Sequence, residues 1–322
     1  MVIFAQRYKI MGNEENTGLV IKAAGSLYTV KDKASGALHE CKIRGKLRLK
    51  DLRTTNPLTV GDVVNYELGD TPVIINLAPR RNYIIRRSTN LSKEAHIVAA
   101  NLDQAFLIFT LDFQRVSLEF LDRFLVSAEA YKIPATIVIN KMDLYGEAQL
   151  KEVREVEKIY SKIGYTVIKT SVEQKDTITA LKSLLDNKIT LFSGNSGVGK
   201  SSLMNTLSPG LEARVGEISD YHKKGKHTTT FSEMFEVAPN TYIVDTPGIK
   251  GFGLVDINPN ELYHFFPEIF AASHSCKFAN CTHVHEPGCA VQQAVSEGGV
   301  SEQRYISYLK MLEGGEDEKY RK

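Results

Sequence analysis

The sequence predicts a multidomain protein with a small N-terminal β-barrel, a central α/β domain and a mostly helical C-terminal unit. Three observations predict this fold class. Short strand patterns separated by turns fill residues 1–88, apolar strands alternate with helical patterns over 89–255, and cysteines cluster with a histidine within 256–322. A chain of 322 residues is long enough for two or three domains of roughly 100 to 150 residues each.

The composition is that of a globular protein, with 43% hydrophobic and 24% charged residues. No segment approaches the roughly 18 to 20 uninterrupted apolar residues of a membrane span, and Arg7 and Lys9 interrupt the N-terminal stretch before a signal-like core forms. We therefore expect a cytoplasmic protein without a membrane partner. Little in the sequence suggests an oligomer, so a monomer is expected.

The N-terminal 88 residues form the basic end of the chain. They contain 15 Lys and Arg against 8 Asp and Glu, a surplus of seven, so a net charge of +2 leaves the remaining residues at −5. Five short strands are predicted at 18–23, 26–31, 37–47, 62–68 and 73–77. Five strands in a small all-β unit indicate a barrel of the OB type.

One strand of this barrel carries a cation at every second position. The cations are Lys42, Arg44, Lys46, Arg48 and Lys50. A period of two places them on one face, where they repel each other unless an anionic partner such as a phosphate backbone lies across them. The alternative is that these cations form a solvated outer face. Further arginines at 53, 80, 81, 86 and 87 favour contact with RNA instead. Because aromatic residues are sparse, we expect recognition of the shape and backbone of the RNA.

The central segment reads as a parallel sheet covered by helices on both faces. Strands are predicted at 104–110, 135–140, 166–170, 189–192, 229–237 and 242–244. Helices are predicted at 118–131, 147–163, 177–185 and 201–207. This alternation is typical of a nucleotide-binding α/β domain.

Residues 194–201, here named the phosphate loop, fit the pattern G-x-x-x-x-G-K-[ST] between a strand and a helix. Its members are Gly194, Asn195, Ser196, Gly197, Val198, Gly199, Lys200 and Ser201, and Ser202 follows. The glycines let successive N–H groups converge on phosphate oxygens at a helix N-terminus. Lys200 would reach the β- and γ-phosphates, and the Ser201 hydroxyl would ligate Mg²⁺. An ordinary Gly-rich turn is the alternative.

The guanine loop, which we define as Asn140, Lys141, Met142 and Asp143, follows a predicted strand. A carboxylate at Asp143 can accept the N1–H and the exocyclic N2–H of guanine, a donor pair that adenine lacks. Asp143 therefore favours GTP over ATP; a charged loop would fit either nucleotide. Ser171 lies in a companion loop, whose backbone could meet the guanine O6.

Asp245-Thr246-Pro247-Gly248 lies at a strand end about 45 residues after the phosphate loop. Asp245 can join the Mg²⁺ shell through water, and the Gly248 N–H can approach the γ-phosphate. Between the two loops, one threonine of 228–230 should close over Mg²⁺, with Thr229 or Thr230 preferred.

These elements resemble those of the Ras-like GTPases in a permuted order. The guanine loop and companion loop come first, followed by the phosphate loop, the switch threonine and the DTPG sequence. Such a circular permutation preserves strand neighbours while moving the termini. It also places the segment after DTPG against the C-terminal unit, so we hypothesise that nucleotide state moves that unit.

Ile249 stands where Ras-like enzymes place the glutamine that orients the attacking water, and an isoleucine cannot hydrogen-bond that water. His227 is the candidate catalytic base within the switch. Lys200 and Thr229 are the other two candidate catalytic residues. The alternative is that His227 contacts only RNA or solvent.

Three cysteines and a histidine, Cys276, Cys281, His283 and Cys289, lie within 14 residues near the C-terminus. They supply a tetrahedral ligand set for one structural Zn²⁺ that leaves no open coordination position. His274 and His285 are competing ligands, and buried free cysteines are the alternative. Predicted helices at 259–270 and 301–312 flank the cluster.

With its OB-like barrel, permuted GTPase and Cys3His unit, the whole chain resembles the ribosome small-subunit-dependent GTPase A (RsgA) family. The resemblance rests on NKMD at Asn140, GNSGVGKSS at Gly194, HTTT at His227, DTPG at Asp245 and the zinc quartet. It implies a GTPase that hydrolyses GTP to GDP, binds the small (30S) ribosomal subunit and its rRNA, assists late maturation, and is stimulated by that subunit. Two other classes remain open: a GTP-regulated RNA scaffold with incidental hydrolysis, and a P-loop ATPase or nucleotide kinase.

Overall fold

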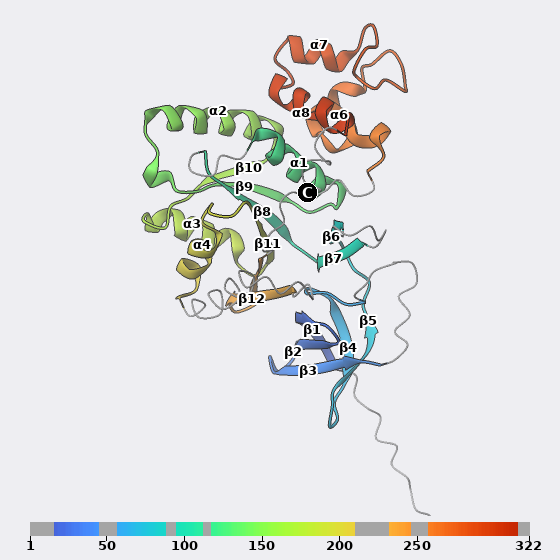
Figure 1. The fold of residues 1–322 in the computed structure, drawn as a ribbon, viewed down its shortest axis with the longest axis vertical. Helices are drawn as coiled ribbons and strands as arrows, with labels where there is room; N and C mark the ends of the chain where they lie inside the picture. Colours follow the sequence, from blue (N-terminus) through green and yellow to red (C-terminus); the bar gives the residue numbers. More distant parts are fainter. Residues whose placement is uncertain are drawn as a thin grey trace, which may run out of the picture.

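The protein consists of three units in a row, with the barrel at one end, the α/β domain in the middle and the helical unit at the other end (Figure 1). The structure, a computed structural model, describes residues 16–44, 57–87, 95–111, 117–209, 232–245 and 257–314. Within these parts of the chain, no helix combines the length and apolar character needed to cross a bilayer.

In the described residues, five strands form the N-terminal barrel. They are β1 (Asn16–Ala24), β2 (Leu27–Asp32), β3 (Leu38–Ile43), β4 (Val63–Glu67) and β5 (Val73–Leu77). The strands pair in the order β1-β2-β3-β5-β4, and a further β4–β1 pairing closes the barrel. The strands form because apolar residues alternate with polar ones: in β2, Tyr28 and Val30 point into the core and Thr29 and Lys31 point away.

Several basic residues of this end are engaged in ion pairs. The side chain of Arg80 is 7% exposed and binds Asp62 through two nitrogens, each at 2.7 Å from a carboxylate oxygen, so it supports the fold. Arg44 binds Glu67 at 2.6 Å with its side chain 62% exposed. Lys42 is exposed in β3, and the other three cations of the alternating stretch, at 46, 48 and 50, lie outside the described residues.

An antiparallel hairpin of β6 (Tyr83–Arg87) and β7 (Ala95–Ala100) links the barrel to the α/β domain. The Thr59 hydroxyl donates to the Val98 carbonyl at 2.9 Å, and Ala100 N–H donates to the Val60 carbonyl at 2.9 Å. Gly61 has φ +86° and a Cβ there would collide with the Ala100 carbonyl, so only glycine permits this close approach.

The sheet of the α/β domain has six strands in the part of the chain that the structure describes. Its strands are β8 (Gln104–Phe109), β9 (Ala135–Ile139), β10 (Thr166–Lys169), β11 (Ile189–Ser193), β12 (Ser232–Ala238) and β13 (Thr241–Asp245), in the order β10-β9-β8-β11-β13-β12. All neighbours are parallel except β12, which is antiparallel to β13. The strand that leads into the phosphate loop, β11, thus lies inside the sheet, beside β8 and β13.

Helices cover both faces of this sheet, as the sequence predicts. Helices α1 (Leu118–Ala130) and α2 (Glu147–Ile163) pack on one face with Leu107 and Phe109 of β8. Helices α3 (Lys175–Leu185) and α4 (Lys200–Leu207) pack on the other face with Phe106 and Ile108. Alternate residues of one strand therefore belong to two cores, which is why buried parallel strands are apolar throughout.

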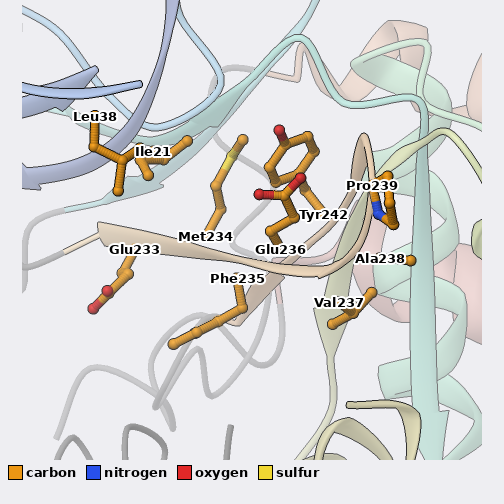
Figure 2. A pocket seen from close by; sticks show the side chains of 10 residues that line it. All are labelled: Ile21, Leu38, Glu233, Met234, Phe235, Glu236, Val237, Ala238, Pro239 and Tyr242. Atoms are coloured by element: carbon orange, nitrogen blue, oxygen red, sulfur yellow. The ribbon is translucent and has the colours of Figure 1, made fainter. Parts of the chain in front are cut away.

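The sheet continues into the barrel through the pairing of β12 with β1, which aligns Lys22 with Glu233 and Ala23 with Ser232. A cavity of about 490 Å³ lies at this junction. Figure 2 shows Met234 and Glu236 projecting to one side of β12 and Phe235 and Val237 to the other. Lys31 reaches across from the barrel and binds Glu236 at 2.6 Å.

The C-terminal unit contains the 3₁₀ segment η3 (Pro259–Phe265) and helices α6 (Pro267–Ser273), α7 (Ala290–Ser296) and α8 (Glu302–Leu312). The single helix predicted over 259–270 is wrong: the chain breaks at Phe266, which is extended at φ −114° and ψ 94°. The cause is Pro267, since a residue before proline is driven out of the helical region.

The C-terminal unit lies against α1 (Figure 1). A buried ionic network connects it to α1 and α2. Arg304 of α8 is fully buried and binds Asp122 of α1 at 2.8 Å and Glu268 of α6 at 2.7 Å. The Tyr160 hydroxyl of α2 donates to the same Asp122 at 2.6 Å. Val126 of α1 completes the apolar core of the C-terminal unit.

Candidate functional site

The phosphate loop connects β11 to α4, as the sequence predicts. Its glycines have positive φ: 147° at Gly194, 82° at Gly197 and 96° at Gly199. A Cβ at Gly194 would collide with the Ile108 carbonyl, so the loop can lie against β8 only with glycine there. The Lys200 ammonium donates to the Gly194 and Asn195 carbonyls at 2.7 and 3.0 Å, which folds its side chain back over the loop.

The guanine loop follows β9 and contacts the phosphate loop directly. The Asn140 amide donates to the Val198 carbonyl at 2.9 Å, and its oxygen accepts from the Thr170 hydroxyl at 3.0 Å. Lys141 has φ 64°, and its ammonium donates to the Gly197 carbonyl at 2.8 Å. Two segments more than 50 residues apart are therefore held at one end of the sheet.

Asp143 is exposed, and its carboxylate accepts a hydrogen bond from the buried Ser171 hydroxyl of the companion loop. Met142, the residue before Asp143, also contacts the companion loop, since its N–H donates to the Thr170 carbonyl at 3.1 Å. The arrangement fixes one carboxylate oxygen and leaves the carboxylate facing solvent, where it can accept from a ligand.

Asp245 ends β13, in register with Phe192 of β11. Burial lowers the pKa of Lys200, and the negative charge of Asp245 opposes this shift, so the two side chains interact electrostatically. Ser201 and Ser202 are exposed in the first turn of α4. Lys200, Asp245 and the two loops thus surround one region at the carboxyl ends of β8, β9, β11 and β13, where open α/β sheets bind ligands.

Three of the predicted residues, His227, Thr229 and Gly248, lie outside the described residues, as do Thr228, Thr230 and Ile249.

The C-terminal unit brings the predicted quartet of Cys276, Cys281, His283 and Cys289 together, with all ligand atoms within 4.8 Å of one another. The Nδ1 of His283 lies 3.6 Å from the Sγ of Cys276 and of Cys289, and those sulfurs are 4.0 Å apart. Tetrahedral zinc requires ligand atoms roughly 3.5 to 3.8 Å apart, given Zn–S of about 2.3 Å and Zn–N of about 2.0 Å. The donor set therefore fits a structural metal ion.

The surroundings of this cluster agree with a metal site. Burial lowers the pKa of His283, which keeps the imidazole neutral as a metal ligand must be. His283 has φ 62°, and its backbone carbonyl accepts from the Tyr305 hydroxyl at 2.6 Å, which fixes the ligand on its turn. His274 and His285 do not belong to the cluster and are exposed.

The sequence model of the family described as RsgA GTPase matches residues 77–255, and that of the RsgA N-terminal domain matches residues 17–72. The chain belongs to the RsgA GTPase family. Among curated relatives, the "Small ribosomal subunit biogenesis GTPase RsgA 2" of Bacteroides thetaiotaomicron is 54% identical over 306 residues, which cover 94% of this chain and 98% of that protein. The Flavobacterium psychrophilum protein named "Small ribosomal subunit biogenesis GTPase RsgA" is 47% identical over 310 residues, which cover 95% of this chain and 94% of that protein.

Two solved structures resemble the fold of this chain. The YjeQ protein of Thermotoga maritima has a TM-score of 0.76 and 38% identity, covering 93% of this chain and 98% of that one. YloQ, described as a circularly permuted GTPase, has a TM-score of 0.73 and 31% identity, and the match covers 98% of this chain and 99% of that one. The predicted family, the three-part fold class and the circular permutation are thereby confirmed.

Sequence reasoning about the RsgA-type site missed Tyr145. Its hydroxyl accepts from the Leu111 N–H at 2.9 Å and donates to the Asn140 carbonyl at 3.0 Å. The available signal was weak: a tyrosine two positions after Asp143, in a segment that reads as a polar loop. The buried Asp122–Arg304 pair was missed as well, because its partners are 182 residues apart.

Proposed function

We propose that this chain binds and hydrolyses GTP to GDP and phosphate, and that it acts in maturation of the small ribosomal subunit. The observation that carries the proposal is the pair of hydrogen bonds joining Asn140 and Lys141 of the guanine loop to the phosphate loop. In this proposal, the contact brings the carboxylate that would read the base close to the loop that would bind the phosphates, as recognition of a whole guanine nucleotide requires. The names of the relatives support the role in subunit biogenesis.

Each residue of the site has a proposed role. Asp143, oriented by Ser171, accepts the N1–H and N2–H of guanine. The backbone N–H groups of the phosphate loop, from Gly194 to Ser202, bind phosphate oxygens. Lys200 exchanges its two carbonyl partners for the β- and γ-phosphates when nucleotide binds.

The Ser201 and Thr229 hydroxyls hold Mg²⁺ in this proposal, with Asp245 acting through water and the Gly248 N–H facing the γ-phosphate. When bound, the ion neutralises charge on the β- and γ-phosphates. The positive charge of the ion suits the carboxylate of Asp245. This residue lies at the carboxyl end of β13, beside the phosphate loop, and supplies the acidic group that such an ion needs.

His227 is the proposed general base, since an imidazole titrates near neutral pH and Ile249 cannot orient water. We further propose that the small ribosomal subunit stimulates hydrolysis. A switch that completes the site only on the subunit would couple turnover to correct binding.

We propose that the barrel spans residues 1–88 and contacts rRNA through its basic strands. The GTPase domain spans residues 89–255, and the zinc unit spans residues 256–322. Cys276, Cys281, His283 and Cys289 would hold one Zn²⁺, whose role is structural because no ligand position is left open. The protein would act as a monomer in the cytoplasm, with no membrane partner.

The test compares GTP and ATP turnover by the purified protein with and without small ribosomal subunits, at fixed salt because RNA binding depends on salt. We expect GTP hydrolysis to exceed ATP hydrolysis and to rise when subunits are added. A preference for ATP would contradict the proposal and favour a P-loop ATPase or nucleotide kinase.

His227→Ala should lower turnover far more than GTP affinity.

One alternative is favoured by a specific observation, Ile249 in place of glutamine. A protein without a water-orienting group could serve as a GTP-regulated RNA scaffold in which hydrolysis is incidental. GTP hydrolysis that stays flat on addition of subunits, together with tight subunit binding, would support the scaffold.

A further inference from the structure

Tyr145 occupies the corner where the guanine loop meets the end of β8. Its side chain is 9% exposed, and its hydroxyl forms two hydrogen bonds, accepting from the Leu111 N–H and donating to the Asn140 carbonyl. Leu111 lies two residues beyond β8 and Asn140 one residue beyond β9. One hydroxyl therefore ties together the carboxyl ends of two neighbouring parallel strands.

The same hydroxyl closes the segment that carries Asp143. The segment begins at Asn140 and ends at Tyr145, with the 3₁₀ turn η1 (Met142–Leu144) between them. Because the side chain of the last residue binds the carbonyl of the first, the span of the segment is fixed. The turn is held further by the Tyr145 N–H, which donates to the Met142 carbonyl at 3.4 Å.

The first residue of this segment is also the one that touches the phosphate loop. The Asn140 side chain donates to the Val198 carbonyl, and the Asn140 N–H donates to the Phe109 carbonyl at 2.9 Å. A shift of the Asn140 backbone would therefore move Asp143 relative to the phosphates. In a rigid site, displacement by a fraction of an ångström weakens hydrogen bonds to the ligand.

We propose that Tyr145 is a positioning residue that sets the specificity of the guanine site: its hydroxyl fixes the Asn140 carbonyl and so places the Asp143 carboxylate to read the 2-amino group of guanine. The inference rests on the proposed GTP function and names a specificity determinant of that site. Tyr145 touches no reacting atom and acts through Asp143.

The test is a competition between GTP and ITP, whose hypoxanthine base keeps the N1–H and lacks the 2-amino group. The ratio of the two kcat/KM values is measured in one sample, so the amount of folded enzyme cancels and a partly unfolded variant still gives a valid ratio. Tyr145→Phe removes the hydroxyl alone. Tyr165→Phe is the matched control, since Tyr165 is also 9% exposed in the same domain and donates to Glu129 at 2.9 Å, away from the guanine loop.

We expect Tyr145→Phe to lower the preference for GTP over ITP on the order of tenfold, through a higher KM for GTP with little change in kcat. Tyr165→Phe should keep the wild-type ratio within about twofold, the change expected when no contact to the base is altered. A Tyr145→Phe ratio equal to that of wild type would overturn the inference and leave the proposed function intact. A wild type without preference for GTP over ITP and ATP would overturn the proposed function and the inference with it.

Discussion

At the residue scale, Asp32, at the end of β2, contributes hydrogen bonds to the barrel through its ionised side chain. Its carboxylate accepts from the Ser35 N–H and hydroxyl, each at 2.7 Å, and from the buried Tyr66 hydroxyl at 2.7 Å. These bonds, led by the Ser35 N–H, lower the pKa of Asp32 to about 2. Because this value lies below the roughly 3.9 of an unfolded aspartate, the bonds stabilise the barrel fully only above about pH 4.

We therefore predict that this part of the stability is lost as the pH falls from about 4 through about 2, the interval between the unfolded and folded pKa values. Tyr66→Phe removes one donor to the carboxylate, so its acid-unfolding midpoint should move to higher pH. Circular dichroism of wild type and variant between pH 7 and pH 2 measures the shift. The same midpoint in both proteins would contradict the assignment.

Several individual residues could be predicted from the sequence because their meaning is local. The phosphate loop and the guanine loop are contiguous motifs, each at the end of an apolar strand, so their placement required only the strand pattern. The role of Arg80 could not be predicted in this way. It belongs to a basic stretch, yet the structure buries it against Asp62, and that partner is set by the closure of the barrel.

At the scale of elements, the contact between the two nucleotide-binding loops depends on Gly199. Its φ is 96°, and a Cβ there would collide with the Asn140 amide nitrogen. Gly199→Ala therefore both strains the backbone and displaces Asn140, which binds the neighbouring Val198 carbonyl. We predict at least about tenfold weaker binding of GDP, measured by calorimetry, because one buried hydrogen bond and the loop geometry are lost.

Gly164→Ala is the control for Gly199→Ala. Gly164 ends α2 with φ 109°, and no atom lies within 4 Å of a Cβ placed there. The variant carries the backbone strain without the collision, so it should lose about 1 kcal/mol of stability and bind GDP like the wild type. Equal GDP affinities for Gly199→Ala and Gly164→Ala would contradict the steric argument.

Most elements of the barrel and of the α/β domain could be predicted in their order along the chain, whereas the hairpin of β6 and β7 and the long-range pairing of strands could not. Strand periodicity places β1 and β12 correctly within a few residues, but nothing in either strand indicates that they pair with each other and join barrel and domain. Register across 211 residues is decided by tertiary packing, which leaves no local pattern. The break at Phe266 is the opposite case, since Pro267 signals it within the sequence.

At the scale of the whole molecule, the Cys3His cluster organises the C-terminal unit. Within the described part of this unit the helices are short, with seven residues in α6 and in α7, and Cys281 and Cys289 form part of the unit's apolar core. Elements this short depend on tertiary contacts, which a bound metal would hold in place.

Cys276→Ala is predicted to lower the zinc content below the one ion per chain expected for wild type, and to lower the helical signal of this unit. His274→Ala and His285→Ala should keep the zinc, because both imidazoles lie outside the cluster. Elemental analysis with circular dichroism measures both quantities. Zinc loss in His274→Ala or His285→Ala equal to that in Cys276→Ala would contradict the ligand assignment.

Docking of the C-terminal unit on the GTPase domain depends on Arg304. Burial raises the pKa of Asp122, and the Arg304 guanidinium at 2.8 Å opposes this shift. Arg304→Met would leave that carboxylate buried without its cation. Such a change typically lowers the free energy of unfolding by about 3–5 kcal/mol. Lys310→Ala on the same helix removes a cation that is 55% exposed and bound to Glu119 at 3.0 Å, which should cost less than about 1 kcal/mol.

This docking also bears on whether nucleotide state moves the C-terminal unit. The unit is fixed to α1 and α2, so nucleotide-driven movement would have to carry both helices or break the Arg304 network. We predict that small-angle scattering curves of the wild type bound to GDP and to a GTP analogue superpose, whereas Arg304→Met gives a larger radius of gyration than Lys310→Ala. Wild-type curves that differ between the two nucleotides would show that the network opens during the cycle, and would support movement of the C-terminal unit.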